Sequence, residues 1–212
     1  CLVQDLPDVL ELFADILRRI ETVPSTPDPE RFVVVGAGQS AAEVVDHLHR
    51  RFPTAEVCSV FAKWGYTPAD DTPYANRIFD AEAVDVYFAA DERVKRMLFD
   101  AHRSTNYSVV DADLINDLYR REYQERVQGR PRLRMMNASE VVSADARDDA
   151  VAVEVAHLPT GERTRLRADA IVYATGYTPS DPATVLGHAG TLLVRRPDGT
   201  TEVCRDYRLV LD

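Results

Sequence analysis

The fold of this chain is decided by Val33-Val34-Val35-Gly36-Ala37-Gly38-Gln39-Ser40-Ala41-Ala42-Glu43. An apolar β-branched run, a glycine turn and the start of an alanine-rich helix follow one another, in the order that a dinucleotide-binding βαβ unit requires. Gly36 permits the tight turn, Gly38 lets the backbone approach a pyrophosphate, and Ala41 lets the helix pack close to the strand. The stretch therefore predicts a nucleotide site, with a glycine turn in another kind of α/β domain as the structural alternative.

The segments after the turn extend this pattern. Apolar spacing predicts a helix over 39–51, and a β-branched run predicts a second strand over 57–61. An NAD-selective site has an Asp or Glu near the end of that strand, where it holds the ribose 2′-hydroxyl. No acid stands there, and Lys63 follows the strand. Because a cation suits the 2′-phosphate, we expect NADP rather than NAD, with a solvated loop lysine as the alternative.

The composition limits the function classes. The 212 residues carry a net charge of −10 and 45% hydrophobic residues, which is ordinary for a globular protein of one large or two small domains. The negative charge argues against nucleic acid or an anionic membrane as the main partner. Three cysteines and five scattered histidines lack metal-ligand spacing, so no metal site is indicated. With no signal peptide and no membrane-length apolar run, we expect a cytoplasmic protein.

Helical periodicity recurs on both sides of the βαβ unit. Further helices are expected over 7–21, 81–88, 92–103 and 112–128. Asp80 and Asp111 stand where N-caps belong, and Gly129 follows the last helix at its C-terminal cap. Two inward faces are expected: Val94, Met97, Leu98 and Ala101 on one helix, and Leu114, Ile115, Leu118, Tyr119 and Val127 on the next.

Strands dominate after residue 133. A hairpin is expected between 150–156 and 163–166, and a buried strand over 170–174 leads into Thr175-Gly176-Tyr177. Pro197-Asp198-Gly199 predicts the turn of a second hairpin. The fold class is therefore α/β, with a Rossmann-type domain, a helical insertion and a β-hairpin. The expected domain limits are 1–30 for a helix and linker, 31–177 for the NADPH-binding domain with its insertion near 64–130, and 178–212 for a returning segment.

Four local signatures stand in order along the chain: GAGQSAAE at 36–43, PADDTPYANRIF at 68–79, NYSVVD at 106–111 and ATGY at 174–177. Together they resemble the flavin-dependent N-hydroxylating monooxygenases, which convert the side-chain amine of L-lysine or L-ornithine to a hydroxylamine for siderophores. The resemblance covers roughly residues 31–177, and residues 205–209 also fit it. It implies a two-dinucleotide-binding-domain flavoprotein that uses FAD, NADPH and O2.

The resemblance assigns cofactor roles to several residues. Gln39 and Ser40 would contact the phosphates or the nicotinamide half of NADPH. Lys63 would replace the family's usual arginine at the 2′-phosphate, although strict alignment could place Ala62 there. Because lysine lacks the bidentate fork of arginine, NADP selectivity would be softened. Thr175 and Gly176 would mark the return toward the flavin domain, with Gly176 allowing a close backbone approach.

The resemblance also assigns substrate contacts. Asn76 and Asn106 would hold the backbone of the amino-acid substrate, because an amide can donate to a carboxylate and accept from an ammonium group. From the residues alone, a cap or turn role is the alternative for both. Tyr107 would contact the cofactor or the substrate channel. Asp70 and Asp71 are interpreted as loop-capping residues rather than an acid–base pair, and no catalytic residue is assigned.

The family reading carries further expectations. The chain lacks an initiator Met, the flavin-binding glycine motif and the substrate-holding lysine of the first domain, so we interpret it as a fragment that alone is inactive and holds no FAD tightly. The family is often tetrameric, which implies a homo-oligomer. The residues do not choose between lysine and ornithine. The rivals are another NAD(P)-dependent flavoprotein oxidoreductase and a non-catalytic nucleotide-binding module.

Overall fold

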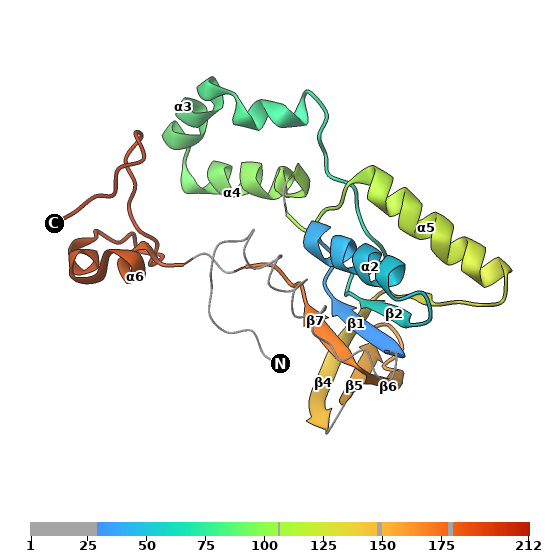
Figure 1. Cartoon of the computed structure of the whole chain (residues 1–212). Coiled ribbons are helices and arrows are strands. Elements are labelled where there is room, and N and C mark those ends of the chain that lie inside the picture. The colour runs from blue at the N-terminus through green and yellow to red at the C-terminus, as the bar shows by residue number, and fades with distance from the viewer. Residues whose placement is uncertain (1–28, 106, 148–149, 178–179) are drawn as a thin grey trace. The chain divides into compact units, whose positions relative to one another are not determined.

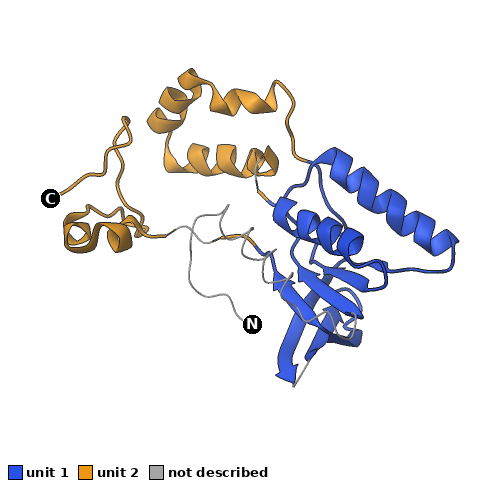
Figure 2. Cartoon of the chain, in the orientation of Figure 1, with its two compact units in different colours: residues 1–68, 108–175 blue, residues 69–107, 176–212 orange. Residues whose placement is uncertain are grey.

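The computed structural model describes residues 29–105, 107–147, 150–177 and 180–212 (Figure 1). The chain divides into two compact units, shown in Figure 2: residues 1–68 with 108–175, and residues 69–107 with 176–212. We call them unit 1 and unit 2. The helix expected over 7–21 lies outside the described residues. No helix in the described part of the chain is both long enough and apolar enough to cross a membrane.

Unit 1 is built on a parallel sheet. Its first elements are β1 (Arg31–Val35), α2 (Gln39–Arg51) and β2 (Glu56–Val60), so the predicted βαβ unit is confirmed. With β3 (Leu133–Met136) and β7 (Ala170–Tyr173) the strands form the order β3-β2-β1-β7, and every pairing is parallel. The carboxyl ends of all four strands therefore lie at one edge, where ligands of open α/β sheets bind.

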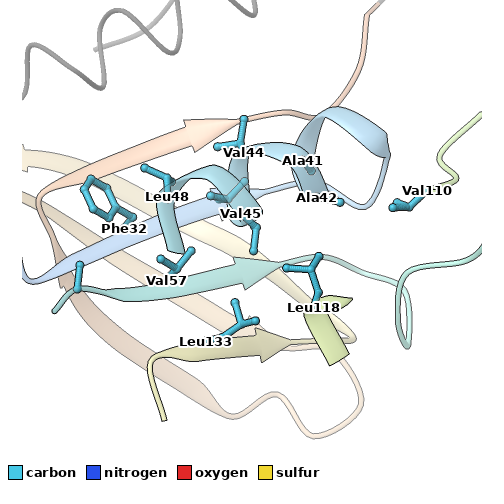
Figure 3. Packing of buried hydrophobic residues seen from close by; sticks show 12 residues of the cluster. Phe32, Ala41, Ala42, Val44, Val45, Leu48, Val57, Val110, Leu118 and Leu133 are labelled. Atoms are coloured by element: carbon cyan, nitrogen blue, oxygen red, sulfur yellow. The ribbon is translucent and has the colours of Figure 1, made fainter. Parts of the chain in front are cut away.

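Helices α2 and α5 (Ala112–Val127) cover one face of this sheet. Figure 3 shows Val44, Val45 and Leu48 of α2 gathered with Phe32 of β1 and Val57 of β2. All five side chains are buried. The apolar spacing of α2 predicts that one side of the helix packs against the strands, and the structure confirms this.

A second sheet covers the other face. It consists of β4 (Ser139–Arg147), β5 (Ala150–His157) and β6 (Arg163–Ala168), paired antiparallel in that order, which confirms the hairpin predicted between 150–156 and 163–166. Val153 and Val155 of this sheet pack with Val33 and Cys58 of the parallel sheet. Cys58 is a core thiol, and burial with the nearby Glu56 carboxylate raises its pKa to about 12. Strands covered on both faces read as continuous apolar runs, as β1 does.

Helix α5 differs from the prediction on its inward face. Only Leu118 is buried, with Leu114 and Ile115 half-buried beside it, whereas Tyr119 is 65% and Val127 is 69% exposed. The prediction was wrong for these two residues because rotation of about 100° per residue turns them away from the stripe. Residues 112–127 also fall within the expected insertion near 64–130, yet α5 packs with α2 and β3 of unit 1.

Unit 2 is largely helical. Its elements are η1 (Ala75–Phe79), α3 (Ala81–Ala89), α4 (Glu92–Ala101), η2 (Arg103–Thr105), α6 (Pro182–Leu186) and η3 (Gly187–Leu192). An ion pair between Arg205 and Asp85 joins its two chain segments. A backbone bridge between Arg195 and Thr201 confirms the turn predicted at 197–199, where Gly199 has a φ of +84°.

Of the inward face predicted for α4, Val94 and Leu98 are half-buried, and the prediction is wrong for Met97 and Ala101. Neither α3 nor α4 has a buried residue, Met97 is 53% exposed, and Ala101 is exposed as well. The periodicity correctly predicts an amphipathic helix, but among the described residues its apolar stripe is at most half-buried. An apolar pattern reports which face prefers burial and does not supply the surface that buries it.

Candidate functional site

The backbone conformation and close packing of the turn after β1 require glycine at position 36. Gly36 has a φ of +142°, and its N–H donates to the carbonyl oxygen of Val60 at 3.0 Å. A Cβ at this position would lie 2.2 Å from the carbonyl oxygen of Ala174 and 3.1 Å from the Cβ of Ala41. Ala41 itself is fully buried. The roles predicted for Gly36 and Ala41, a tight turn and close helix packing, are therefore confirmed.

Gly38 differs from Gly36 in its backbone conformation and in the space around it. It is the N-cap of α2 in an extended conformation that any residue adopts, and a Cβ there would meet the Cα of Ser108 at 3.7 Å, an ordinary contact. The protein's own packing would therefore accept a side chain at position 38. A side chain at this position would instead cover backbone that is accessible beside the first turn of the helix.

The N-terminus of α2 has the polarity of an anion site. No side chain caps the helix, and no acidic residue lies in its first turn. The first N–H groups of an α-helix have no intrahelical partner and carry a partial positive charge. Ser40 is exposed in this turn. The residues present therefore fit a phosphate group at the carboxyl edge of the parallel sheet.

Lys63 lies three residues beyond β2. Its Nζ donates to the carbonyl oxygen of Ser108 at 2.6 Å and to Oγ1 of Thr67 at 3.3 Å. No carboxylate among the described residues forms an ion pair with it, so its charge is not neutralised there. The neighbouring Ala62 is exposed and brings no charge. Lys63 is therefore a cation without a carboxylate partner among the described residues, beyond the carboxyl end of the second strand.

Gln39 is held by another part of the chain. Its Nε2 donates to Oδ2 of Asp111 at 2.8 Å, and its Oε1 accepts from the backbone N–H of Asp111 at 2.8 Å. The same Nε2 lies 2.9 Å from Oε1 of Glu43. Asp111 is the N-cap residue of α5, but its side chain makes no cap hydrogen bond. The capping role predicted for this side chain is wrong, because the carboxylate binds Gln39 instead.

Two of the predicted cofactor residues, Thr175 and Gly176, follow the end of β7. Thr175 and Gly176 are exposed, and Gly176 has a φ of +89°. No described atom lies within 4 Å of a Cβ built on Gly176, so the packing of this chain does not itself require a glycine there, and the approach expected toward the flavin side stays a prediction. The backbone conformation favours glycine there. A close backbone approach does occur two residues earlier, where the Ala174 carbonyl lies against Gly36.

The expected substrate residues belong to unit 2. Asn76 is exposed in η1, and its Nδ2 donates to the carbonyl oxygen of Asp71 at 3.0 Å, which is the turn role that the residue alone allows. Tyr107 is 58% exposed and stacks obliquely with Phe99. Asn106 lies outside the described residues. Asp70 accepts from the Thr72 hydroxyl at 3.0 Å, as a loop-capping residue does.

Seven of the predicted site residues fall in unit 1, at or after the carboxyl ends of β1, β2 and β7: Gly36, Gly38, Gln39, Ser40, Ala41, Lys63 and Thr175. Sequence reasoning missed the parts played there by Ala174, Ser108 and Asp111, which all lie in the quoted ATGY and NYSVVD segments. Among the described residues, no group of three or more potential ligands could hold a metal ion.

Comparison with known proteins agrees with this arrangement. The family model described as L-lysine 6-monooxygenase/L-ornithine 5-monooxygenase matches residues 10–179. An L-ornithine N(5)-monooxygenase from Burkholderia cepacia is 37% identical over 201 residues, covering 91% of this chain and 44% of that protein. One from Pseudomonas aeruginosa is 30% identical, covering 89% and 41%. The chain spans less than half the length of these curated relatives.

Solved structures give the same picture. The ornithine N-hydroxylase of Kutzneria sp. 744, solved with reduced FAD, NADP+ and L-ornithine, matches with a TM-score of 0.86 and 42% identity over 94% of this chain and 47% of that one. The L-lysine 6-monooxygenase of Pseudomonas syringae matches with a TM-score of 0.75 and 29% identity, covering 98% and 51%. Both similarities extend over nearly the whole chain.

Proposed function

The chain belongs to the L-lysine 6-monooxygenase/L-ornithine 5-monooxygenase family, and we propose that it is the NADPH-binding portion of a flavin monooxygenase that N-hydroxylates the side-chain amine of L-ornithine. The observation that carries this proposal is the uncapped first turn of α2 behind a glycine that the fold requires. The same edge of the sheet carries an unneutralised lysine.

The pyrophosphate of NADPH is assigned to the turn at residues 36–41. The backbone N–H groups that open α2 and the hydroxyl of Ser40 would donate to it. Gly38 supports this assignment because the protein's own packing would accept a Cβ at that position. A glycine there serves a ligand that must come close to the backbone.

The 2′-phosphate is assigned to Lys63. Its ammonium group has no carboxylate partner among the described residues, and no acid at the end of β2 would repel the phosphate. Lysine is a point charge without the planar fork of arginine, so we expect a preference for NADPH over NADH that is real but modest.

FAD, when bound, supplies the oxygen chemistry, and NADPH supplies the reducing equivalents. The residues of this chain bind and orient the reductant. Asn76 and Asn106 are proposed to contact the amino-acid substrate, Tyr107 to contact the cofactor or the substrate channel, and Thr175 and Gly176 to lie beside the cofactors. The homo-oligomeric state, the cytoplasmic location and the role in siderophore synthesis are part of the same proposal.

L-Ornithine is proposed over L-lysine from the comparisons. The relatives at 37% and 42% identity are described as ornithine enzymes, whereas the lysine enzyme is 29% identical. The two substrates differ by one methylene group, which is worth only about 1–3 kcal/mol of discrimination in a pocket. We therefore expect kcat/KM to be about 10- to 200-fold higher for L-ornithine than for L-lysine.

The test is hydroxylamine formation by the full-length, FAD-supplemented protein with NADPH and air, with L-ornithine and L-lysine offered in parallel. The expected result is NADPH-dependent hydroxylamine, formed faster from L-ornithine. Faster product from L-lysine would overturn the substrate assignment alone. NADPH oxidation without hydroxylamine from either amine would favour another flavoprotein oxidoreductase, and no NADPH oxidation would favour a non-catalytic nucleotide-binding module.

A further inference from the structure

Residues 108–111 connect the lysine of the proposed NADP site to the first turn of α2, and we call them the strap. Val109 and Val110 are buried, and the Val110 N–H donates to the carbonyl oxygen of Thr67 at 2.9 Å. A backbone bridge between Pro68 and Val110 continues this attachment. The middle of the strap is therefore anchored in unit 1, and its two ends carry the contacts of interest.

The first end of the strap fixes the ammonium group of Lys63. Ser108 has a φ of +59°, a left-handed conformation that is unfavourable for a non-glycine residue and needs support from its surroundings. In this conformation its carbonyl oxygen accepts from Nζ of Lys63 at 2.6 Å. An ammonium group has three donors, and the bonds to Ser108 and Thr67 use two of them. The third is left for an anion.

The second end of the strap is tied to α2 through two hydrogen bonds between Gln39 and Asp111, both 2.8 Å long. An aspartate at an N-cap ordinarily accepts a hydrogen bond from the first turn of its own helix. Asp111 does not do so. Its carboxylate is directed to Gln39, 72 positions earlier in the sequence, so the needs of α5 do not account for it.

We infer that Asp111 is a positioning residue for NADP selectivity. Through Gln39 it holds the strap on the first turn of α2, and through the Ser108 carbonyl the strap holds the Lys63 ammonium group where the 2′-phosphate would bind. This inference rests on the proposed function. It also explains how a lysine, which lacks the planar fork of arginine, acquires a defined orientation at this site.

The experiment compares NADP+ and NAD+ affinities, by titration calorimetry, of the full-length FAD-loaded protein and its variants. Asp111→Ala is expected to weaken NADP+ binding about fivefold or more while NAD+ binding changes less than twofold. Asp111→Asn keeps an acceptor for Gln39 and is expected to stay within twofold of wild type for both. Asp113→Ala, an exposed aspartate in the first turn of the same helix, is the matched control and is expected to change neither.

A double-variant cycle with Lys63→Ala completes the test. Because Asp111 acts through Lys63, the double variant is expected to bind NADP+ no more weakly than Lys63→Ala alone. Additive losses, or an equal loss of NADP+ and NAD+ affinity in Asp111→Ala, would overturn the inference. Should Asp111→Ala fail to fold, Gln39→Ala removes the same tie and is expected to lower the NADP+ to NAD+ affinity ratio equally.

The two proposals fail in different ways. A wild-type protein that does not prefer NADP+ to NAD+, or that loses no preference in Lys63→Ala, refutes the assignment of Lys63 to the 2′-phosphate, and the inference falls with it. A wild-type protein that discriminates through Lys63, with an unchanged ratio in Asp111→Ala and Gln39→Ala, refutes the role of Asp111 alone.

Discussion

His49 is a buried histidine that the fold keeps neutral. Arg121, which can only donate, lies 3.0 Å from Nδ1, and Nε2 lies 2.8 Å from Oε1 of Glu125 and 3.0 Å from Nη2 of Arg132. Burial lowers the pKa of His49, and the guanidinium groups of Arg132 and Arg121 lower it further against the opposing effect of Glu125. Protonation would place a third positive charge in this cluster.

Stability is therefore expected to depend on pH through His49. The unfolded chain takes up the proton near pH 6.5, and the folded protein does so only at lower pH, so the free energy of unfolding declines as the pH falls from about 7.5 through 6.5 toward the lowered pKa. The pKa of Glu125 is itself lowered, so its carboxylate stays ionised across this window. Urea unfolding at several pH values should show a smaller decline in His49→Gln. An identical decline in both proteins would contradict this reading.

Single residues were predictable from the sequence where the requirement is local. Gly36 and Ala41 follow from the motif because the turn and the helix contact involve immediate neighbours. The partner of Gln39 could not be found that way, since Asp111 lies 72 residues further along the chain. Its position also fits an ordinary N-cap equally well, and only the three-dimensional contact separates the two roles.

At the level of elements, α5 provides an internal comparison. Leu118 is 1% exposed within the core cluster, whereas Val127 on the same helix is 69% exposed. Leu118→Ala is expected to lower the free energy of unfolding by about 2–5 kcal/mol, because it removes buried methyl groups and leaves a cavity. Val127→Ala is expected to change it by less than about 0.5 kcal/mol. Denaturant unfolding of both variants tests this, and comparable losses would restore the inward face first predicted for Val127.

Element boundaries were predicted well and packing partners less well. The helix over 39–51 and the hairpin strands agree with the sequence because periodicity and turn residues act over a few positions. The apolar stripe of α4 was expected to be buried, yet Met97 is 53% exposed. Periodicity identifies a face that prefers burial, whereas the burying surface must come from elsewhere in a protein.

At the scale of the whole molecule, the negative net charge contrasts with the positive groups at the proposed cofactor site. The chain carries a net charge of −10, yet the carboxyl edge of the parallel sheet presents a helix N-terminus without a first-turn acid and a lysine without a carboxylate partner among the described residues. Two carboxylates that do lie near this turn, those of Asp111 and Glu43, are both bound by the side-chain amide of Gln39. We therefore expect this region to bind the phosphates of NADPH.

The decisive measurement is the NADP+ affinity of Ser40→Asp. Its control is Ser40→Asn, in which asparagine has the shape of aspartate without the charge. A carboxylate in the first turn favours the helix by about 0.3–1 kcal/mol, so stability should hold or rise, while the same charge repels a phosphate. NADP+ affinity of the full-length, FAD-loaded protein is expected to fall at least about tenfold, or 1.4 kcal/mol, in Ser40→Asp relative to Ser40→Asn. Equal NADP+ affinity in the two variants would contradict the assignment of the NADPH phosphates to this region.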